Sequence, residues 1–170
     1  MRFLRPVIYA ATALLCASAA SAQNVRISNL SDVSTPLWQT GDPDIVQDVY
    51  VCIYRENTSG SARTYSITAT GDGPGYFIKS GGETLAYSVT WNDGGAANPD
   101  GGSSAPMTNN VALTLRNNAR IETDTPTYSS DCNAGASPTG RVRVTITSLN
   151  LDAAHDGDYT GTLTLVLSPT

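Results

Sequence analysis

The single histidine and the acids around it are the residues with the most evident chemical potential. His155 lies among Asp152, Asp156 and Asp158, a set that could transfer protons or hold a cation. The spacing does not match the calcium-binding loop, which needs oxygen ligands at its first, third and fifth positions and then a glycine. Asp and Gly are common in turns, so we interpret these residues as a solvent-exposed turn.

No other pattern in the sequence indicates catalysis. The nucleophile elbow, the zinc-protease helix motif and the phosphate-binding loop are all absent from the sequence. Two distant cysteines and one histidine do not form a metal-ligand cluster either. We therefore predict a protein that is not an enzyme, with no catalytic residue, no metal site and no cofactor.

The first 22 residues have the pattern of a secretory signal peptide. Arg2 and Arg5 precede a mostly apolar run at 7–20, and Ala-Ser-Ala at 20–22 forms a cleavage site before Gln23. The run is shorter than the roughly 20 apolar residues that span a bilayer. We expect residues 1–22 to be removed and residues 23–170 to form one domain that does not insert into a membrane. Export would carry it to the periplasm and onward to the cell surface or the extracellular space.

The charge balance excludes two classes of partner. The chain has 15 acidic and 10 basic residues, and removal of the signal peptide makes it more acidic because Arg2 and Arg5 are lost. Nucleic acids and acidic membrane surfaces are bound by basic faces. We therefore expect neither as a partner. The charged share of 15% is also low, and the polar share consists mainly of Ser, Thr, Asn and Gly, which suits strands and turns.

Two cysteines, Cys52 and Cys132, remain after export. An oxidising compartment favours closure of such a pair, so we predict a disulfide between them. In the loop-closure description this link would stabilise the fold by about 4 kcal/mol. Two free thiols are the alternative. Cys16 would mark a lipoprotein, but it follows Leu15 rather than the small residue that lipidation requires.

Apolar and polar side chains alternate in five segments, which is the pattern of half-buried strands. Residues 48–54 are apolar on both faces, which predicts either a central strand covered on both sides or a strand whose outer face contacts a partner. Clusters of Gly, Asn and Pro separate these segments, and we expect the longest, residues 93–110, to be a flexible loop. The pattern predicts an all-β protein: a two-sheet antiparallel sandwich of about seven or eight strands. The alternating rows are Tyr65/Ile67/Ala69, Leu85/Tyr87/Val89/Trp91, Val111/Leu113/Leu115, Val142/Val144/Ile146 and Leu163/Leu165/Leu167.

The turn before the last row carries a further signal of a sandwich. Tyr159 follows Gly157 by two residues at the start of a predicted strand, which is how a tyrosine corner is built. We interpret Tyr159 as structural, with its hydroxyl bonded back to the backbone of the turn. The motif ordinarily begins with Asp, and this sequence has His155 in that place.

The resemblance of this sequence to a known family is carried by six segments: Asn29–Val33, Val49–Tyr54, Tyr65–Gly71, Tyr87–Asp93, Asp131–Cys132 and Tyr159–Leu165. They resemble exported proteins of the spore coat protein U type, which are similar to subunits of archaic chaperone-usher fimbriae. The resemblance implies an immunoglobulin-like sandwich that lacks its last strand. It also implies that a periplasmic chaperone, and later a neighbouring subunit, supplies the missing edge.

The C-terminal row offers an edge for such a strand. The sequence ends three residues after Leu167, so we expect no later segment to pair with the outer edge of Leu163, Leu165 and Leu167. We interpret this row as the acceptor edge. Val25 and Ile27, shortly after the cleavage site, would lie on the same face of an extended strand, and they form a possible donor strand. An equal alternative is that they form the domain's own first strand.

These observations favour an exported, non-catalytic structural subunit of a cell-surface fibre or coat. It would assemble by β-strand complementation with a periplasmic chaperone or with like subunits. The alternative is a self-complete extracellular module that binds carbohydrate or protein through aromatic side chains. Trp91 continues an alternating row and Trp38 lies beside an apolar segment, so both are expected in the core. Tyr76, Phe77 and Tyr128 lie near turns and are the better candidates for exposure.

Overall fold

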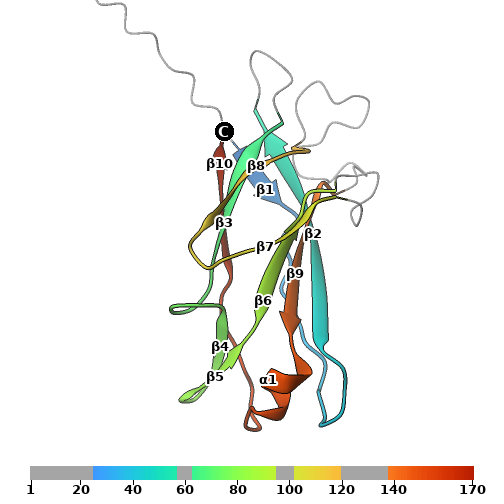
Figure 1. The fold of residues 1–170 in the computed structure, drawn as a ribbon, viewed down its shortest axis with the longest axis vertical. Coiled ribbons are helices and arrows are strands. Elements are labelled where there is room, and N and C mark those ends of the chain that lie inside the picture. The colour runs from blue at the N-terminus through green and yellow to red at the C-terminus, as the bar shows by residue number, and fades with distance from the viewer. Residues whose placement is uncertain (1–24, 57–62, 95–101, 120–137) are drawn as a thin grey trace, which may run out of the picture.

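Residues 25–56, 63–94, 102–119 and 138–170 are described by the computed structural model of the chain. They form ten strands and one short helix (Figure 1), and every pairing between neighbouring strands is antiparallel. The predicted all-β antiparallel sandwich is confirmed. The elements are β1 (Val25–Ser28), β2 (Ile45–Arg55), β3 (Tyr65–Thr70), β4 (Phe77–Ser80), β5 (Glu83–Ala86), β6 (Ser88–Asn92), β7 (Ser104–Pro106), β8 (Ala112–Arg116), β9 (Gly140–Ile146), α1 (Ser148–Asp152) and β10 (Thr164–Pro169).

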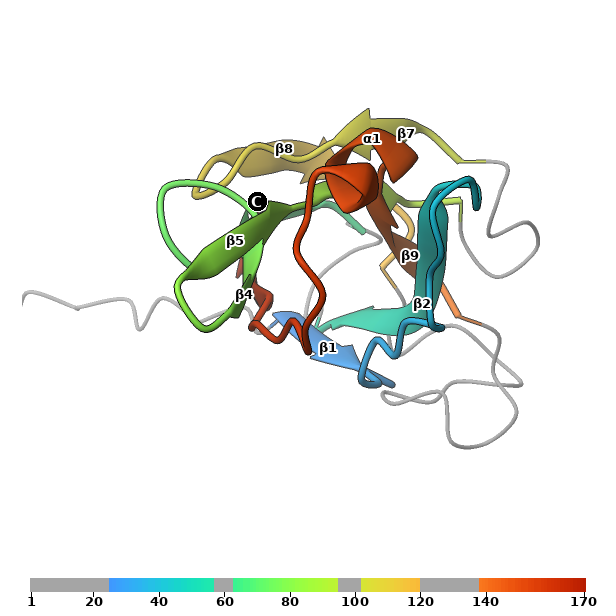
Figure 2. The ribbon, with the colours of Figure 1, turned by 90° about the horizontal axis from the view of Figure 1, so that it is seen from below.

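The strands form two sheets and a separate hairpin. The larger sheet has the order β1-β2-β9-β6-β7, the smaller sheet has the order β10-β3-β8, and β4 pairs with β5. Seen along the long axis, the strands surround a common interior, with β1 on the side away from β8 (Figure 2). Most neighbours in these sheets are distant in sequence, so the register depends on non-local pairing.

The interior is filled by the alternating rows that the sequence predicted. Tyr65, Ile67 and Ala69 of β3 are fully buried, as is Trp91 of β6. The rings of Tyr65 and Trp91 meet edge to face with their centroids 6.2 Å apart, a favourable geometry for two aromatic rings. Val142 of β9 belongs to the same buried cluster. The prediction of which side chains of these strands face the core is therefore confirmed.

β2 is the central strand that the apolar run predicted. It lies between β1 and β9, and its last five residues, Val51 to Arg55, are all buried. Val51 and Ile53 pack into the main core. On the opposite face the guanidinium of Arg26 lies over the ring of Tyr54, 5.3 Å from its centroid, a cation–π contact.

The run from Leu85 to Trp91 was predicted as one strand, and this was wrong. It divides at Tyr87 into β5, which pairs with β4, and β6, which pairs with β9 and β7. The break has local causes: the amide of Tyr87 donates to the carbonyl of Tyr76 at 3.0 Å, and the side chain of Asn150 donates to the carbonyl of Ala86 at 3.1 Å. Alternation of side chains continues through Tyr87 and so did not reveal that the backbone changes its partner strand there.

The expected loop at 93–110 also needs correction. Residues 104–106 form β7, and the side chain of Asn92 donates to the hydroxyl of Ser104 at 2.8 Å. Met107 is buried in the main core. Val111, predicted as a core residue, precedes β8 and is 52% exposed, because its amide closes a turn onto Thr108 at 3.0 Å. Turn geometry therefore outweighed the apolar pattern here.

A second, smaller core lies at the end of the molecule that carries α1. Its buried residues are Ile45, Leu85 and Ile146, and Trp38 and Leu151 pack against them. Thr147 caps α1, its side-chain oxygen accepting from the amide of Asn150 at 3.3 Å, as is usual at a helix N-terminus. This core joins the loop before β2 to the hairpin and to α1.

Candidate functional site: an apolar groove beside the last strand

The first strand ends abruptly at Asn29. In the register of β1 with β2, Ile27 lies opposite Ile53, so continuation would place Asn29 opposite the fully buried Val51. A polar side chain in that position would lose its hydration. Asn29 instead adopts a left-handed backbone with φ of 63°, and its side-chain amide donates to the carbonyl of Tyr50 at 2.9 Å. The chain therefore turns away from β2 after Ser28.

This departure leaves part of β2 with a single neighbour. Residues 45–49 of β2 pair with β9, and among the described residues no strand pairs with their other edge. The segment from Leu30 to Thr35 leaves the sheet as irregular, exposed chain. It forms one wall of a groove rather than a continuation of β1.

The opposite wall is formed by β10 and the residues before it. β10 pairs with β3 on one side, and no described strand hydrogen-bonds to its other edge, although β1 lies beside it. Leu163, Leu165 and Leu167 pack against the main core, whereas Thr164 is exposed and Val166 is 52% exposed. The structure thus places the predicted row on the inner face of an edge strand.

Between these walls lies an apolar groove of about 480 Å³. Its floor is built from valine and isoleucine side chains of β2 and β9, and Leu163 and Leu165 line one wall. Leu167 does not line it. The lining residues are Leu30, Ser31, Asp32, Val33, Thr35, Val49, Ile78, Tyr87, Val142, Val144, Ile146, Tyr159, Thr160, Gly161, Thr162, Leu163 and Leu165.

Tyrosines take part in the lining of the groove. Tyr87 packs against Tyr76 with ring centroids 5.5 Å apart. Burial raises the pKa of Tyr87 to about 12, and burial also raises the pKa of Tyr76. The phenol of Tyr87 therefore gives the groove an uncharged polar group at physiological pH.

The wall before β10 is held by several backbone contacts. Thr160 and Lys79 exchange backbone hydrogen bonds of 2.8 and 2.9 Å. The amide of Thr162 donates to a carboxylate oxygen of Asp72 at 3.0 Å, and the hydroxyl of Tyr159 donates to the carbonyl of His155 at 3.1 Å. The last bond is the backward contact expected of a tyrosine corner. The Thr160–Lys79 pair fixes the wall against β4 of the hairpin, and the other two bonds hold the residues on either side of it.

The remaining predicted site residues lie away from the groove or outside the described ranges. Val25 and Ile27 belong to β1, which pairs with β2 in the same chain and packs on the main core. This is the arrangement of a first strand of the domain itself. Cys52 is fully buried in β2, whereas Cys132 and the signal peptide lie outside the described residues. The predicted disulfide therefore stays a prediction.

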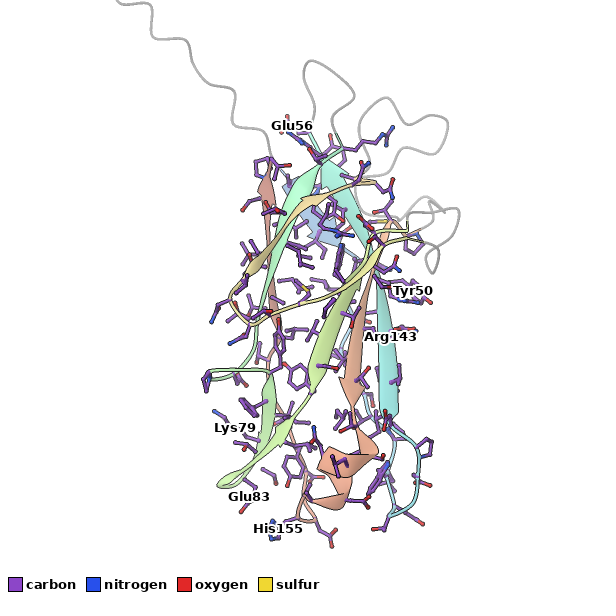
Figure 3. All side chains as sticks on the ribbon, in the orientation of Figure 1. Tyr50, Glu56, Lys79, Glu83, Arg143 and His155 are labelled. Atoms are coloured by element: carbon purple, nitrogen blue, oxygen red, sulfur yellow. The ribbon has the colours of Figure 1, made fainter. Side chains whose placement is uncertain are left out.

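The outer face of the larger sheet carries the charged residues of β2 and β9. Arg143 donates two hydrogen bonds of 2.7 Å to the carboxylate of Asp48, and Arg141 lies 3.7 Å from the same carboxylate. The bonds from Arg143 are the main reason why the pKa of Asp48 is lowered. Arg143 and Tyr50 lie together on this side (Figure 3). Strand alternation thus separates this ionic face from the apolar floor of the groove.

His155 and the acids around it lie at the exposed end of the molecule. His155 is 3.8 Å from Glu83, and both side chains are largely exposed (Figure 3). Within the described ranges, no three His, Cys, Asp or Glu side chains gather as a metal site requires. No helix in the same ranges is long and apolar enough to cross a membrane. The turn has the exposure that its composition predicted.

The aromatic residues do not form an exposed platform in the described part of the chain. Tyr76, expected to be a candidate for exposure, is buried in the main core because it packs against Tyr87. Phe77 and Trp38 are half-buried, and the indole of Trp38 donates to the carbonyl of Pro43 at 3.0 Å. Tyr128 lies outside the described residues.

Sequence reasoning found one wall of the groove and missed the rest. The row of β10 was recognised from alternation, but the role of Leu30 to Thr35 was not. A usable signal was present, because Asn29 and Ser31 stand at positions where an extended β1 would need core residues. The floor strands were recognised only as core.

Comparison with solved structures supports the fold, whereas no known family is matched. No family model matches the sequence, and no curated protein matches it, so the resemblance to the spore coat protein U type stays a prediction. A solved structure, described as a chaperone–tip adhesin complex vital for synergistic activation of CFA/I fimbriae biogenesis, aligns with 86% of this chain. The TM-score is 0.56 at 17% sequence identity. The tip adhesin CupB6 from Pseudomonas aeruginosa aligns over the same share, with a TM-score of 0.47 and 14% identity.

The first of these likenesses defines the class of the fold, a β-sandwich of the kind found in a chaperone–tip adhesin complex. At such low identity the first alignment shows the fold alone. The chain covers 42% and 43% of the two chains that it matches, so it spans less than half of their length.

Proposed function

We propose that this protein is an exported, non-catalytic structural subunit of a cell-surface fibre or coat. In this proposal an extended strand from a partner, either a periplasmic chaperone or another subunit, completes its sandwich. The observation that carries the proposal is the apolar groove between Leu30–Thr35 and Thr160–Leu165. Its walls follow the edge of β10 and the edge of residues 45–49 of β2, to which no strand in the described ranges is paired.

The groove has the chemistry that strand addition needs. An unpaired edge supplies backbone donors and acceptors, and an apolar floor supplies pockets for alternate side chains. Val142, Val144 and Ile146 form such a row on the floor, and Leu163 and Leu165 face it from one wall. A ligand-binding module would instead present convergent polar groups to a small molecule. Here the floor is aliphatic, and Asp32, the charged side chain among the described lining residues, is exposed.

The likeness to a chaperone–tip adhesin complex supports the same proposal through the fold. The predicted signal peptide supports the export that this proposal requires. Surface location, fimbrial assembly and the chaperone as partner belong to this proposal.

Expression with its own signal peptide, followed by light scattering coupled to size separation, tests the proposal. We expect the exported wild type as strand-linked assemblies or in complex with a strand donor. Leu165→Asp should prevent this because its side chain lines the groove, whereas the exposed neighbour Thr164→Asp should not. A wild type recovered as a stable monomer with a cooperative melt would overturn the proposal, and so would equal effects of the two substitutions.

A further inference from the structure

The groove is lined almost entirely by uncharged side chains, and Asp32 is the exception. Among the described residues that line it, Asp32 is the only acidic or basic one. Its side chain is exposed on the irregular wall that follows β1. An uncompensated carboxylate beside an apolar channel attracts a cation of whatever occupies that channel.

The neighbouring charged residues point away from the groove. On β2 and β9 the floor residues Val49 and Val142 alternate with Asp48 and Arg143, which lie on the outer face. On the hairpin, Ile78 lines the groove and the next residue, Lys79, is exposed on the other side of the strand. None of these cations is in contact with Asp32 in the described part of the chain.

A second carboxylate increases the negative potential at the opposite wall. Asp72 accepts a hydrogen bond from the amide of Thr162, and its Oδ2 lies 3.2 Å from the position that a Cβ on Gly161 would take. Gly161 and Thr162 both line the groove. The channel is therefore apolar at its floor, with the carboxylate of Asp32 on one wall and that of Asp72 behind the other.

We infer that Asp32 selects the strand that completes the sandwich, by pairing with a lysine or arginine on that strand. This inference rests on the proposed function. The occupant is a strand of a different protein, with apolar side chains at alternate positions facing the floor and a cationic side chain at an outward position near the rim. A second copy of this chain is not favoured, because its own Val25–Ser28 is paired with β2.

Synthetic peptides provide the test. The parent peptide has about nine residues, roughly 30 Å when extended, with valine at alternate positions and threonine between them. In two further series each threonine in turn is replaced by lysine or by glutamate. The predicted mature chain, residues 23–170, is refolded with each peptide in excess, and the Kd is measured by competition against the labelled parent peptide.

We expect the best-placed lysine to tighten binding about three- to fivefold over the parent peptide, as for a partly exposed ion pair. Glutamate at that position should weaken it. Asp32→Asn should remove the difference between the three peptides, and so should salt near 1 M, which shortens the screening length to about 3 Å. The control Asp158→Asn, in an exposed turn, should keep the difference.

The outcomes separate the two proposals. If the parent peptide binds but lysine gives no gain, or if Asp32→Asn keeps the gain, the role of Asp32 is overturned and the groove keeps its function. If no peptide binds, the proposed function fails. If the refolded chain forms strand-linked polymers without any peptide, the occupant is a second copy, and the assignment to a different protein is overturned.

Discussion

The side-chain amide of Asn29 donates a hydrogen bond to the carbonyl oxygen of Tyr50, 2.9 Å away, one residue after β1 ends. The contact replaces the backbone pairing that a longer β1 would have made with β2. Asn29 has φ of 63°, a conformation that glycine and asparagine tolerate better than other residues. One residue thus both ends a strand and begins the wall of the groove.

Substitution of Asn29 should separate the two contributions. Asn29→Gly keeps the left-handed backbone but loses the hydrogen bond, which should cost about 0.5–1.5 kcal/mol of unfolding free energy. Asn29→Ala should cost about 1 kcal/mol more, because alanine is strained at positive φ. Urea denaturation of the two variants measures the difference. Equal stability of both would contradict this account of the turn.

Tyr159 should contribute through its hydroxyl as well as through its ring. Tyr159→Phe removes the hydrogen bond to the carbonyl of His155 and should lower the unfolding free energy by about 0.5–1.5 kcal/mol. Tyr159→Leu also loses ring packing in the smaller core and should cost more. Thermal melts of both variants test this order. An unchanged melting temperature for Tyr159→Phe would show that the hydrogen bond of the tyrosine corner does not stabilise the fold.

Asp48 should make stability depend on pH in the acid range. Because hydrogen bonds from Arg143 lower its folded-state pKa below the ordinary value of 3.8, its contribution is complete above that value. It is lost as the pH falls through the lower pKa of the folded protein. Asp48→Asn should therefore reduce stability at pH 7 by about 1–2 kcal/mol and flatten the acid limb of the stability curve.

Denaturant midpoints measured between pH 2 and pH 7 check this expectation. Arg143→Gln removes the main donor and should shrink the same acid limb. If both variants lose as much stability between pH 7 and pH 2 as the wild type does, other carboxylates control acid unfolding.

The disulfide predicted between Cys52 and Cys132 should be visible as a difference between oxidised and reduced protein. Reduction of the wild type should lower its unfolding free energy by about 2–5 kcal/mol. Cys132→Ser should give a protein of similar stability that no longer responds to reductant. Cys52→Ser should cost somewhat more, since it also places a hydroxyl in a fully buried position of β2. A wild type indifferent to reductant would refute the disulfide.

Several features of the fold follow from the sequence alone. Alternation identified the buried faces of β3 and β9, and the doubly apolar run identified β2 as a central strand. These predictions succeeded because side chains on a strand alternate between two faces whatever the strand pairs with. The turn at His155 and the contact of Tyr159 were also accessible, since both depend on neighbours within a few residues.

The groove was decided by the tertiary structure. It exists because Asn29 turns the chain away from β2, because β10 pairs with β3 on one side, and because Thr160 is held against β4. None of these partners is close in sequence, and alternation does not say which edge of a strand stays unpaired. The same reason explains the error at Tyr87, whereas the error at Val111 came from a local turn onto Thr108 that alternation did not reveal. The sequence by itself determined which side chains face inward, whereas the pairing of distant strands determined where the interior stays open.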